Sequence, residues 1–321
     1  MLIESVKHFM HRFQLYRVLT NSYKRWSIRH YPFKEIERCY KIVFGNSPNL
    51  SSPKNLIEKI YWMELFADLT EWTKCEDKYK MRDYIDSKGL SQYLPRLLGH
   101  WEDVDSFSLE HLPKSFVLKS NNGCGTVLVI RDKNTANERV IKKTLKEWLR
   151  TPYGYTNAGL HYLAIKPCII AEELLSQNEE YSTLSPNALI DFKVYCINGE
   201  PKCIWVAYDR NPPKVKSALY DTNWIPLTDK IRNMEHYVFC PEIEIPRPKC
   251  LDEMLRISSI LSQPLPQMRV DFYVIHDKPV IGELTLATGY GFFTEQYYEE
   301  LGKEIDLSKV KLATIPNYQT I

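Results

Sequence analysis

The chain has 321 residues, which is enough for one large domain or two to three small ones. Its hydrophobic content of 44% and charged content of 26% are those of an ordinary soluble globular protein. The net charge of +2 gives no sign of the concentrated basic surface of a nucleic-acid binder, so no nucleic-acid partner is expected.

Cysteine usage and the N-terminus both favour a cytoplasmic protein. The eight cysteines form no Cys-x-x-Cys pair and have no histidine at zinc-binding spacing, so buried free thiols in a reducing compartment are the simplest interpretation. Charged residues such as Lys7 and Arg12 interrupt any signal-peptide core. No uninterrupted apolar run approaches the roughly 18 residues of a membrane-spanning helix.

Residues 2–30 are predicted to form a basic amphipathic helix. Five apolar side chains between Leu2 and Tyr16 recur at three-to-four spacing. Residues 1–31 hold six Lys and Arg against one Glu, a local net charge of +5. Packing on the rest of the chain is the favoured interpretation. A weak peripheral contact with the inner face of an anionic membrane is the alternative.

After a proline- and serine-rich loop or linker predicted for residues 31–52, helices and strands are mixed along the chain. Helices are predicted at 53–68, 76–88 (ending at Gly89), 138–150, 250–262 and 294–303. Strands are predicted at 115–119, 126–131, 168–174, 191–197 and 201–208, with a hairpin within 267–291. Because the strands come largely as hairpins, an α+β fold with antiparallel sheets is expected.

The hairpin within 267–291 carries several charged residues in otherwise apolar strands. Arg269 and Asp271 lie two apart and share one face of the first strand, and the second strand carries Glu283 followed by Thr285. Pairing would place Asp271 opposite Glu283. Two carboxylates on an apolar sheet are costly unless a cation neutralises them. The cation is either a divalent metal that carries phosphates or a structural partner such as Arg269.

A second motif, FVLKSNNGCGTVLVIR over 116–131, predicts a phosphate-binding loop between two strands. Gly123 and Gly125 would let backbone N–H groups approach a phosphate, and Lys119 adds a mobile positive charge. The motif is neither a Walker A nor a Rossmann fingerprint. A plain hairpin with glycine turn residues is the alternative.

Three weaker motifs accompany these two. Glu172 and Glu173 end a strand and could bind an adenine amino group or a ribose, or face solvent. Asp191 and Lys193 share a strand face and could contact ribose and phosphates, or pair with each other. Lys78 stands near a helix start, where it is either functional or solvated.

The order of these motifs resembles that of ATP-grasp enzymes, and within them the TupA-like branch. The matching segments are DKYKMR at 77–82, LPKSFVLKSNNGCG at 112–125, IIAEELL at 169–175, DFKVYCINGEP at 191–201 and RVDFYVIHDKPVIGELT at 269–285. The glycine loop and the hairpin also resemble those of D-alanine–D-alanine ligases. The likeness spans about residues 53–291.

The resemblance implies an α+β ATP-grasp fold in which two subdomains sandwich ATP behind a helical N-terminal region. The implied parts are a helical region (1–52), a substrate-side subdomain (53–112), a central subdomain with the phosphate loop (113–173) and a C-terminal subdomain with the metal site (174–321).

The resemblance also implies ATP and Mg²⁺ as cofactors and a role for each site residue. ATP would be bound by Lys78, Lys119, Gly123, Gly125, Glu172, Glu173, Leu174 and Asp191. The metal would be held by Asp271, Glu283 and Thr285, and Arg269, Lys119 and Lys193 are implied as catalytic cations. Thr285 stands where D-alanine–D-alanine ligases have Asn but where the TupA-like pattern has Thr, which leaves the number of metals open.

The implied activity is a carboxylate–amine ligase that works through an acylphosphate. Its partners would be a sugar acid or polysaccharide precursor and an amino acid or other amine, in bacterial capsular or O-antigen polysaccharide biosynthesis. A sugar or polyol kinase, a polysaccharide-cluster glycosyltransferase and a non-catalytic nucleotide-binding partner remain alternatives. The pair Asp271 and Glu283 argues against the last. The Asp-x-Asp at 103–105 is interpreted as a polar turn, so it does not support sugar transfer.

Overall fold

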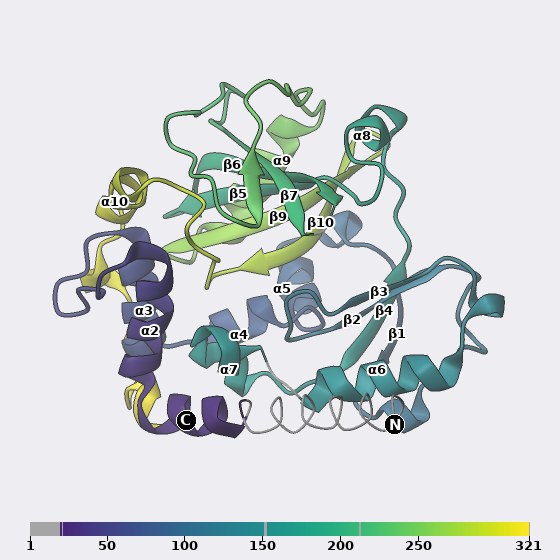
Figure 1. The fold of residues 1–321 in the computed structure, drawn as a ribbon, viewed down its shortest axis with the longest axis horizontal. Helices are drawn as coiled ribbons and strands as arrows, with labels where there is room; N and C mark the ends of the chain where they lie inside the picture. Colours follow the sequence, from purple (N-terminus) through teal and green to yellow (C-terminus); the bar gives the residue numbers. More distant parts are fainter. Residues whose placement is uncertain (1–19, 21, 151–152, 212, 321) are drawn as a thin grey trace, which may run out of the picture.

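The computed structural model describes residues 20, 22–150, 153–211 and 213–320. These residues form two sheets of mainly antiparallel strands with helices around them (Figure 1). The helix predicted for residues 2–30 lies mostly outside the described residues. Its described part, residues 22–30, is helical.

The smaller sheet has four antiparallel strands and is covered on one face by α6. Its strand order is β1 (Leu97–Trp101), β4 (Ile169–Glu173), β2 (Phe116–Ser120) and β3 (Val127–Ile130). Ile141 and Leu145, one turn apart on α6 (Glu138–Arg150), are buried against Phe116 and Leu118. This small core fixes β2 and therefore the start of the glycine loop.

The larger sheet has six strands, and only its last pair, β7 with β8, is parallel. The order is β10 (Lys278–Thr285), β9 (Gln267–Ile275), β5 (Asp191–Ile197), β6 (Glu200–Asn211), β7 (Lys214–Tyr220) and β8 (Tyr237–Phe239). One face packs against α9 (Leu251–Ser262), whose inner side includes Met254 and Ile257. Side chains alternate along the strands, so the opposite face receives the polar residues of β5 and β9.

The remaining helices connect and flank the sheets. They are α2 (Pro32–Phe44), α3 (Leu56–Phe66), α4 (Thr70–Glu76), α5 (Met81–Ser87), α7 (Gly154–Asn157), α8 (Glu179–Leu184) and α10 (Glu295–Lys303). Short 3-10 turns are η1 (Ser91–Tyr93), η2 (Val104–Ser106), η3 (Lys133–Thr135), η4 (Leu160–Ala164), η5 (Leu307–Lys309) and η6 (Asn317–Gln319). In Figure 1, α4 and α5 lie between the two sheets, and α4 contacts β10.

The α+β fold with antiparallel sheets is confirmed, and the predicted helix at 138–150 has the same bounds as α6. The linker predicted for 31–52 is wrong over Pro32–Phe44, which forms α2. Pro32 is tolerated there because the first helical residues have no intrahelical partner for their N–H groups. Gly45, with a φ of 77°, then ends the helix.

The helix predicted at 76–88 is also partly wrong, because α5 begins only at Met81 and a separate helix, α4, precedes it. Gly89 ends α5 with a φ of 69°, as predicted. The prediction missed β1, β7 and β8. All eight cysteines are free, and six of them are buried. Among the described helices, none has the length and apolarity to cross a membrane.

Candidate functional site

The predicted hairpin is formed by β9 and β10, joined by a two-residue turn at 276–277. Both turn residues have positive φ, 50° and 60°, which suits the twist of a tight hairpin. In the register, Asp271 faces Glu283 and Arg269 faces Thr285. The opposition of the two carboxylates is therefore confirmed.

Asp271 lies between two cations on the polar face of the larger sheet. The Arg269 guanidinium donates from Nε and Nη2 to the two carboxylate oxygens at 2.6 and 2.8 Å, and Lys193 on β5 donates as well. Asp271 is only 2% exposed. Burial acts to raise the pKa of its carboxyl group, but the two cations outweigh burial and lower it. The structural salt bridge that the sequence left open is therefore present, and it orients this carboxylate.

Lys78 joins the hairpin to the glycine loop. Its Nζ donates to Glu283 Oε1 at 2.8 Å and to the carbonyl oxygen of Gly123 at 2.8 Å. The lysine is buried, which acts to lower its pKa, but the Glu283 carboxylate raises the pKa above its usual value. A charged lysine is therefore held where phosphates would lie.

Two buried side chains that the sequence did not single out hold Lys78 in this place. Asn121 Nδ2 donates to Asp77 Oδ1 at 2.9 Å, and the Lys78 amide donates to the Asn121 carbonyl at 3.0 Å. Asn121 Oδ1 in turn accepts from the Cys168 amide at 2.8 Å. Both residues stand inside the quoted motifs, DKY and K-x-N-x-G, so the motifs contained a signal for them.

The glycine loop needs glycine at both predicted positions, for different reasons. A Cβ on Gly123 would lie 2.4 Å from Thr126 Oγ1 and 2.6 Å from Ser120 Oγ, which are hydrogen-bonded to each other at 2.6 Å. Gly125 has a φ of 73°, a conformation that costs other residues about 1–2 kcal/mol. The loop backbone is thus kept free of side-chain bulk between β2 and β3.

Glu172 belongs to the same polar cluster and is neutralised from two sides. Its carboxylate accepts from Lys119 Nζ at 2.6 Å and from Arg82 Nη1 at 3.0 Å. Arg82 was missed as a site residue, although it ends the quoted DKYKMR segment. Glu173 points elsewhere and accepts from the Arg96 amide at 2.8 Å, so the structure brings Glu172 into the cluster and not Glu173.

At the other end of the cluster, Asp191 pairs with two cations. Lys193 Nζ lies 3.6 Å from Asp191 Oδ2, and Arg210 of β6 donates to the same oxygen. Burial acts to lower the pKa of Lys193, but Asp191 and Asp271 raise it. Arg210 was missed because no motif contains it. Leu174 follows β4 and is half-buried outside these contacts.

A buried histidine, His161, lies between two carboxylates next to the end of β10. His161 Nδ1 lies 2.6 Å from Glu64 Oε1, and its Nε2 lies 3.2 Å from Glu76 Oε2. Burial acts to lower the pKa of His161, but the two carboxylates raise it to about 10. Glu76 also accepts from the backbone amides of Leu286 and Ala287, just after the β9–β10 hairpin. This group therefore connects α3, α4 and η4 to the end of β10.

Ion pairs join basic and acidic side chains from both sheets in the cluster. Six basic side chains meet four carboxylates in these pairs: Lys78, Arg82, Lys119, Lys193, Arg210 and Arg269 against Glu172, Asp191, Asp271 and Glu283. The basic side chains would be available to contact the phosphates of a nucleotide.

The oxygen donors of the hairpin fit Mg²⁺. Asp271, Glu283 and the Thr285 hydroxyl offer hard oxygen ligands on two paired strands. Within the described residues, no group of three or more His, Cys, Asp or Glu could hold a metal ion alone. Phosphate oxygens and water would have to complete the shell, which is the usual arrangement for Mg²⁺.

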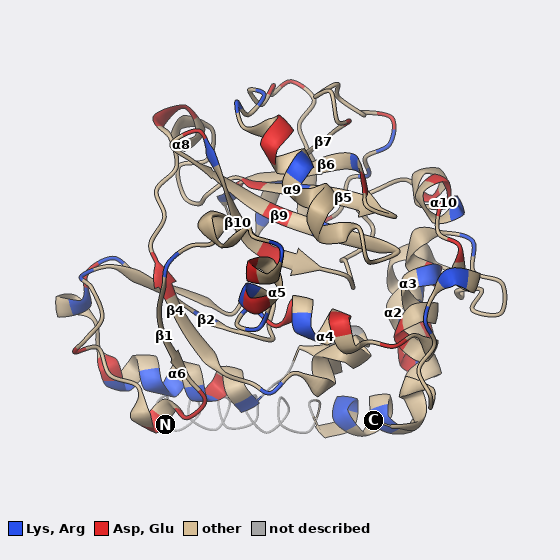
Figure 2. Cartoon of the chain, turned by 180° about the vertical axis from the view of Figure 1, so that it is seen from behind, with Lys and Arg blue, Asp and Glu red and all other residues tan. Residues whose placement is uncertain are grey.

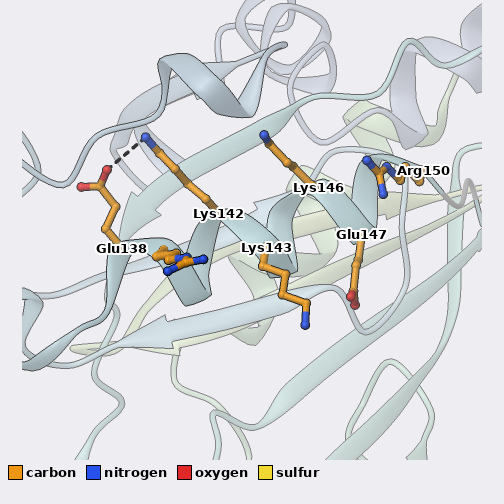
Figure 3. Close-up of a pocket in the computed structure, with 7 residues that line it drawn as sticks. Glu138, Lys142, Lys143, Lys146, Glu147 and Arg150 are labelled. Carbon is orange, nitrogen blue, oxygen red and sulfur yellow. Dashed lines mark ion pairs between the residues drawn. The ribbon is translucent and has the colours of Figure 1, made fainter. Parts of the chain in front are cut away.

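A hollow along the outer side of α6 contains none of the predicted site residues. Figure 3 shows it lined by charged side chains of α6 alone, with Glu138 and Lys142 in an ion pair at 3.1 Å. It has no glycine loop and no carboxylate pair across strands, so it does not compete with the cluster between the sheets.

Two sheets that bring a glycine loop, ion-paired lysines and a carboxylate hairpin together define a nucleotide-binding protein of the ATP-grasp class. The family described as TupA-like ATPgrasp matches residues 58–306, and the chain belongs to this family. The resemblance inferred from the motifs is thereby confirmed. No curated protein matches the chain.

Solved structures with a similar fold include several ligases. The D-alanine–D-alanine ligase from Bacillus anthracis complexed with ATP is 13% identical, with a TM-score of 0.47, over 81% of this chain and 75% of that chain. The L-amino acid ligase from Bacillus licheniformis is 14% identical, with a TM-score of 0.39, over 68% of this chain and 42% of that chain. At these values the likenesses say nothing about substrates.

Proposed function

We propose that the protein is an ATP- and Mg²⁺-dependent carboxylate–amine ligase that works through an acylphosphate. The observation that carries the proposal is that Lys78 and Arg269 contact the opposed carboxylates Glu283 and Asp271, and that Lys78 also contacts the glycine loop. Lys119 adds a further cation, held by Glu172. Membership of the ATP-grasp family supports it, because ligases are the activity that the family resemblance implies.

In the first step, an acceptor carboxylate oxygen would attack the γ-phosphorus of ATP, and the bond to the ADP oxygen would break. The amine would then attack the acyl carbon, lose a proton and release inorganic phosphate. Both steps develop negative charge that fixed cations stabilise. Arg269 is held rigidly by both oxygens of Asp271, so it suits the role of a preorganised donor. Mg²⁺ held by Asp271 and Glu283 would neutralise phosphate charge.

The two lysines would act by exchanging partners. Lys78 and Lys119 now donate to Glu283 and Glu172, and a bound triphosphate would compete for both ammonium groups. Glu172 would not be left as an unpaired buried charge, because Arg82 still contacts its other oxygen at 3.0 Å. The glycine loop would close over the phosphates and exclude the water that otherwise hydrolyses an acylphosphate.

The finer proposal concerns the substrates. We propose an amino acid or other amine and a sugar acid of a bacterial surface polysaccharide, which is the pathway that the TupA-like resemblance implies. The basic cluster would also suit an anionic acceptor, since the acceptor carboxylate must lie near Arg269 and the γ-phosphate. A sugar or polyol kinase would use the same nucleotide contacts and differs only in the acceptor.

The test is a screen of ADP release against pairs of sugar acids and amino acids, followed by isotope transfer. With ¹⁸O in the acceptor carboxylate, a ligase moves one labelled oxygen into the released phosphate, because the acylphosphate forms through that oxygen. ADP release with all label kept in the acceptor would rule out the ligase and favour the kinase. No ADP release with any pair, while ATP binds, would favour a non-catalytic partner.

A further inference from the structure

The segment from residue 22 to residue 34 presents an unusual number of aromatic rings to solvent. Four of its ring side chains are more than one third exposed: Tyr23 at 62%, Trp26 at 47%, Tyr31 at 43% and Phe33 at 41%. Several large aromatic side chains that are exposed within one short segment indicate an interaction surface.

Tyr23, Trp26 and Tyr31 form an ordered group at the helix 22–30, whereas Phe33 packs edge-on against Tyr318 at 5.1 Å. Trp26 stacks on His30 at 5.1 Å between centroids, meets Tyr31 edge-on at 5.3 Å and lies 6.1 Å from Tyr23. Ser27 and Ile28 are buried on the inner side, so the helix is anchored and cannot turn its rings inward. The aromatic surface is therefore preorganised.

Positive charge surrounds these rings and negative charge is absent from the segment. No acidic residue stands between residues 20 and 34, whereas Arg25, Arg29 and Lys34 are all exposed. Lys34 Nζ lies 4.8 Å from the centre of the Tyr31 ring. Figure 2 shows this helix, beside the mark for the C-terminus, with basic and no acidic segments. Rings and cations together define a basic aromatic face.

We propose that this basic aromatic face binds the surface of an anionic lipid bilayer. Tyr and Trp side chains favour the headgroup region, where the ring is partly buried and its polar end stays hydrated. Exposed Arg and Lys residues are attracted by anionic headgroups. A soluble acidic polymer would satisfy the cations but would give the exposed rings no apolar phase to enter, so the rings favour lipid.

The face also borders the candidate site through α7. The Arg25 guanidinium lies 5.1 Å from the centre of the Tyr155 ring and donates to the Arg150 carbonyl at the end of α6. Burial, and after it the nearby Cys124 of the glycine loop, raise the pKa of Tyr153, two residues before Tyr155. Binding to a bilayer would thus place α7, and the site beside it, close to the membrane surface.

Vesicle co-sedimentation of the full chain, without nucleotide, tests the proposal. The probes are vesicles of phosphatidylcholine alone and vesicles of phosphatidylcholine mixed with phosphatidylglycerol. Replacement of Arg29 and Lys34 by Gln should weaken binding to the mixed vesicles on the order of 30-fold, because each basic residue near such a surface contributes roughly fivefold. The matched control, Lys249→Gln with Lys303→Gln, removes two exposed lysines elsewhere and should bind like the unchanged chain.

A second variant, Tyr23→Ser with Trp26→Ser, separates lipid from other anions. It should weaken vesicle binding by roughly tenfold while retention on soluble polygalacturonate stays unchanged, because only the bilayer offers an apolar phase. The proposal is overturned by no binding of the unchanged chain to mixed vesicles, by equal binding to neutral vesicles, or by ring variants that bind vesicles normally. Since no nucleotide is present, each of these results leaves the proposed ligase site untouched.

Discussion

Two substitutions that each remove one carboxylate of the hairpin should differ sharply in their effect on stability. Asp271→Asn and Glu283→Gln each remove a full negative charge and one proposed metal ligand. Asp271 is 2% exposed and neutralises both Arg269 and Lys193, which are themselves buried. Its loss leaves Arg269 without its carboxylate partner and Lys193 with only the more distant Asp191, which we expect to lower the free energy of unfolding by about 3–5 kcal/mol.

Glu283 has a side chain that is 28% exposed, and among the described residues its ion pair is with Lys78. After Glu283→Gln, Lys78 keeps its hydrogen bond to the Gly123 carbonyl at 2.8 Å, and the amide oxygen can still accept from it. The free energy of unfolding should therefore fall by about 1 kcal/mol only. Turnover should fall in both variants by roughly 100- to 1,000-fold, since each loses a group that positions charge in the transition state.

Urea unfolding followed by circular dichroism measures the stability of both variants, and ADP release measures turnover at a temperature where both are folded. Equal destabilisation by the two substitutions would refute the argument from burial. Normal ADP release by folded Glu283→Gln, with saturating substrates, would refute the assignment of the hairpin to the metal site.

Three further predictions concern other parts of the site. Lys119→Ala should leave the fold intact, because Arg82 still neutralises Glu172, and should lower turnover by roughly 100-fold in the same ADP assay; a large loss of stability would contradict this. Gly125→Ala should raise the KM for ATP roughly fivefold, because the loop must adopt a positive φ of 73° that costs alanine about 1 kcal/mol; an unchanged KM would contradict it. His161 has a folded-state pKa of about 10, above the unfolded value of about 6.5, so its contribution to stability is complete below pH 6.5 and is lost as pH rises toward 10. The free energy of unfolding should fall by up to about 1.4 kcal/mol per pH unit in that window, and His161→Gln should remove this slope.

Local patterns predicted most of the elements that build the site. Alternating polar and apolar residues predicted β5 and the β9–β10 hairpin, and the apolar stripe at Ile141 and Leu145 predicted α6 with its bounds. These patterns are predictive because each element packs one face against the core, so the burial of its side chains follows the helix or strand period. The prediction for the region before α3 was wrong, since the several prolines there predicted a loop although Pro32 begins a helix.

The ion pairs of the site could not be predicted from the sequence. Arg82 and Glu172 are 90 residues apart, and nothing in the local sequence of either residue indicates the other. Arg210 contacts Asp191 across adjacent strands, and only the register of β5 against β6 brings it there. Asn121, in the predicted glycine loop, and Asp77, in the helix predicted at 76–88, had no predicted role, yet their buried hydrogen bond helps to set the position of Lys78.

The sequence by itself determined the chemical groups of this protein: two loop glycines, mobile lysines, and a hairpin with opposed carboxylates, in an order that identified the ATP-grasp family. Strand periodicity and the tight turn predicted that the two carboxylates lie near each other, but only the β-bulge between Ile281 and Glu283 shifts the register so that Asp271 faces Glu283 and not Gly282. Only the tertiary structure decided which cation neutralises which carboxylate. Such pairing depends on distances between side chains from both sheets, and electrostatic energies follow those distances rather than sequence order.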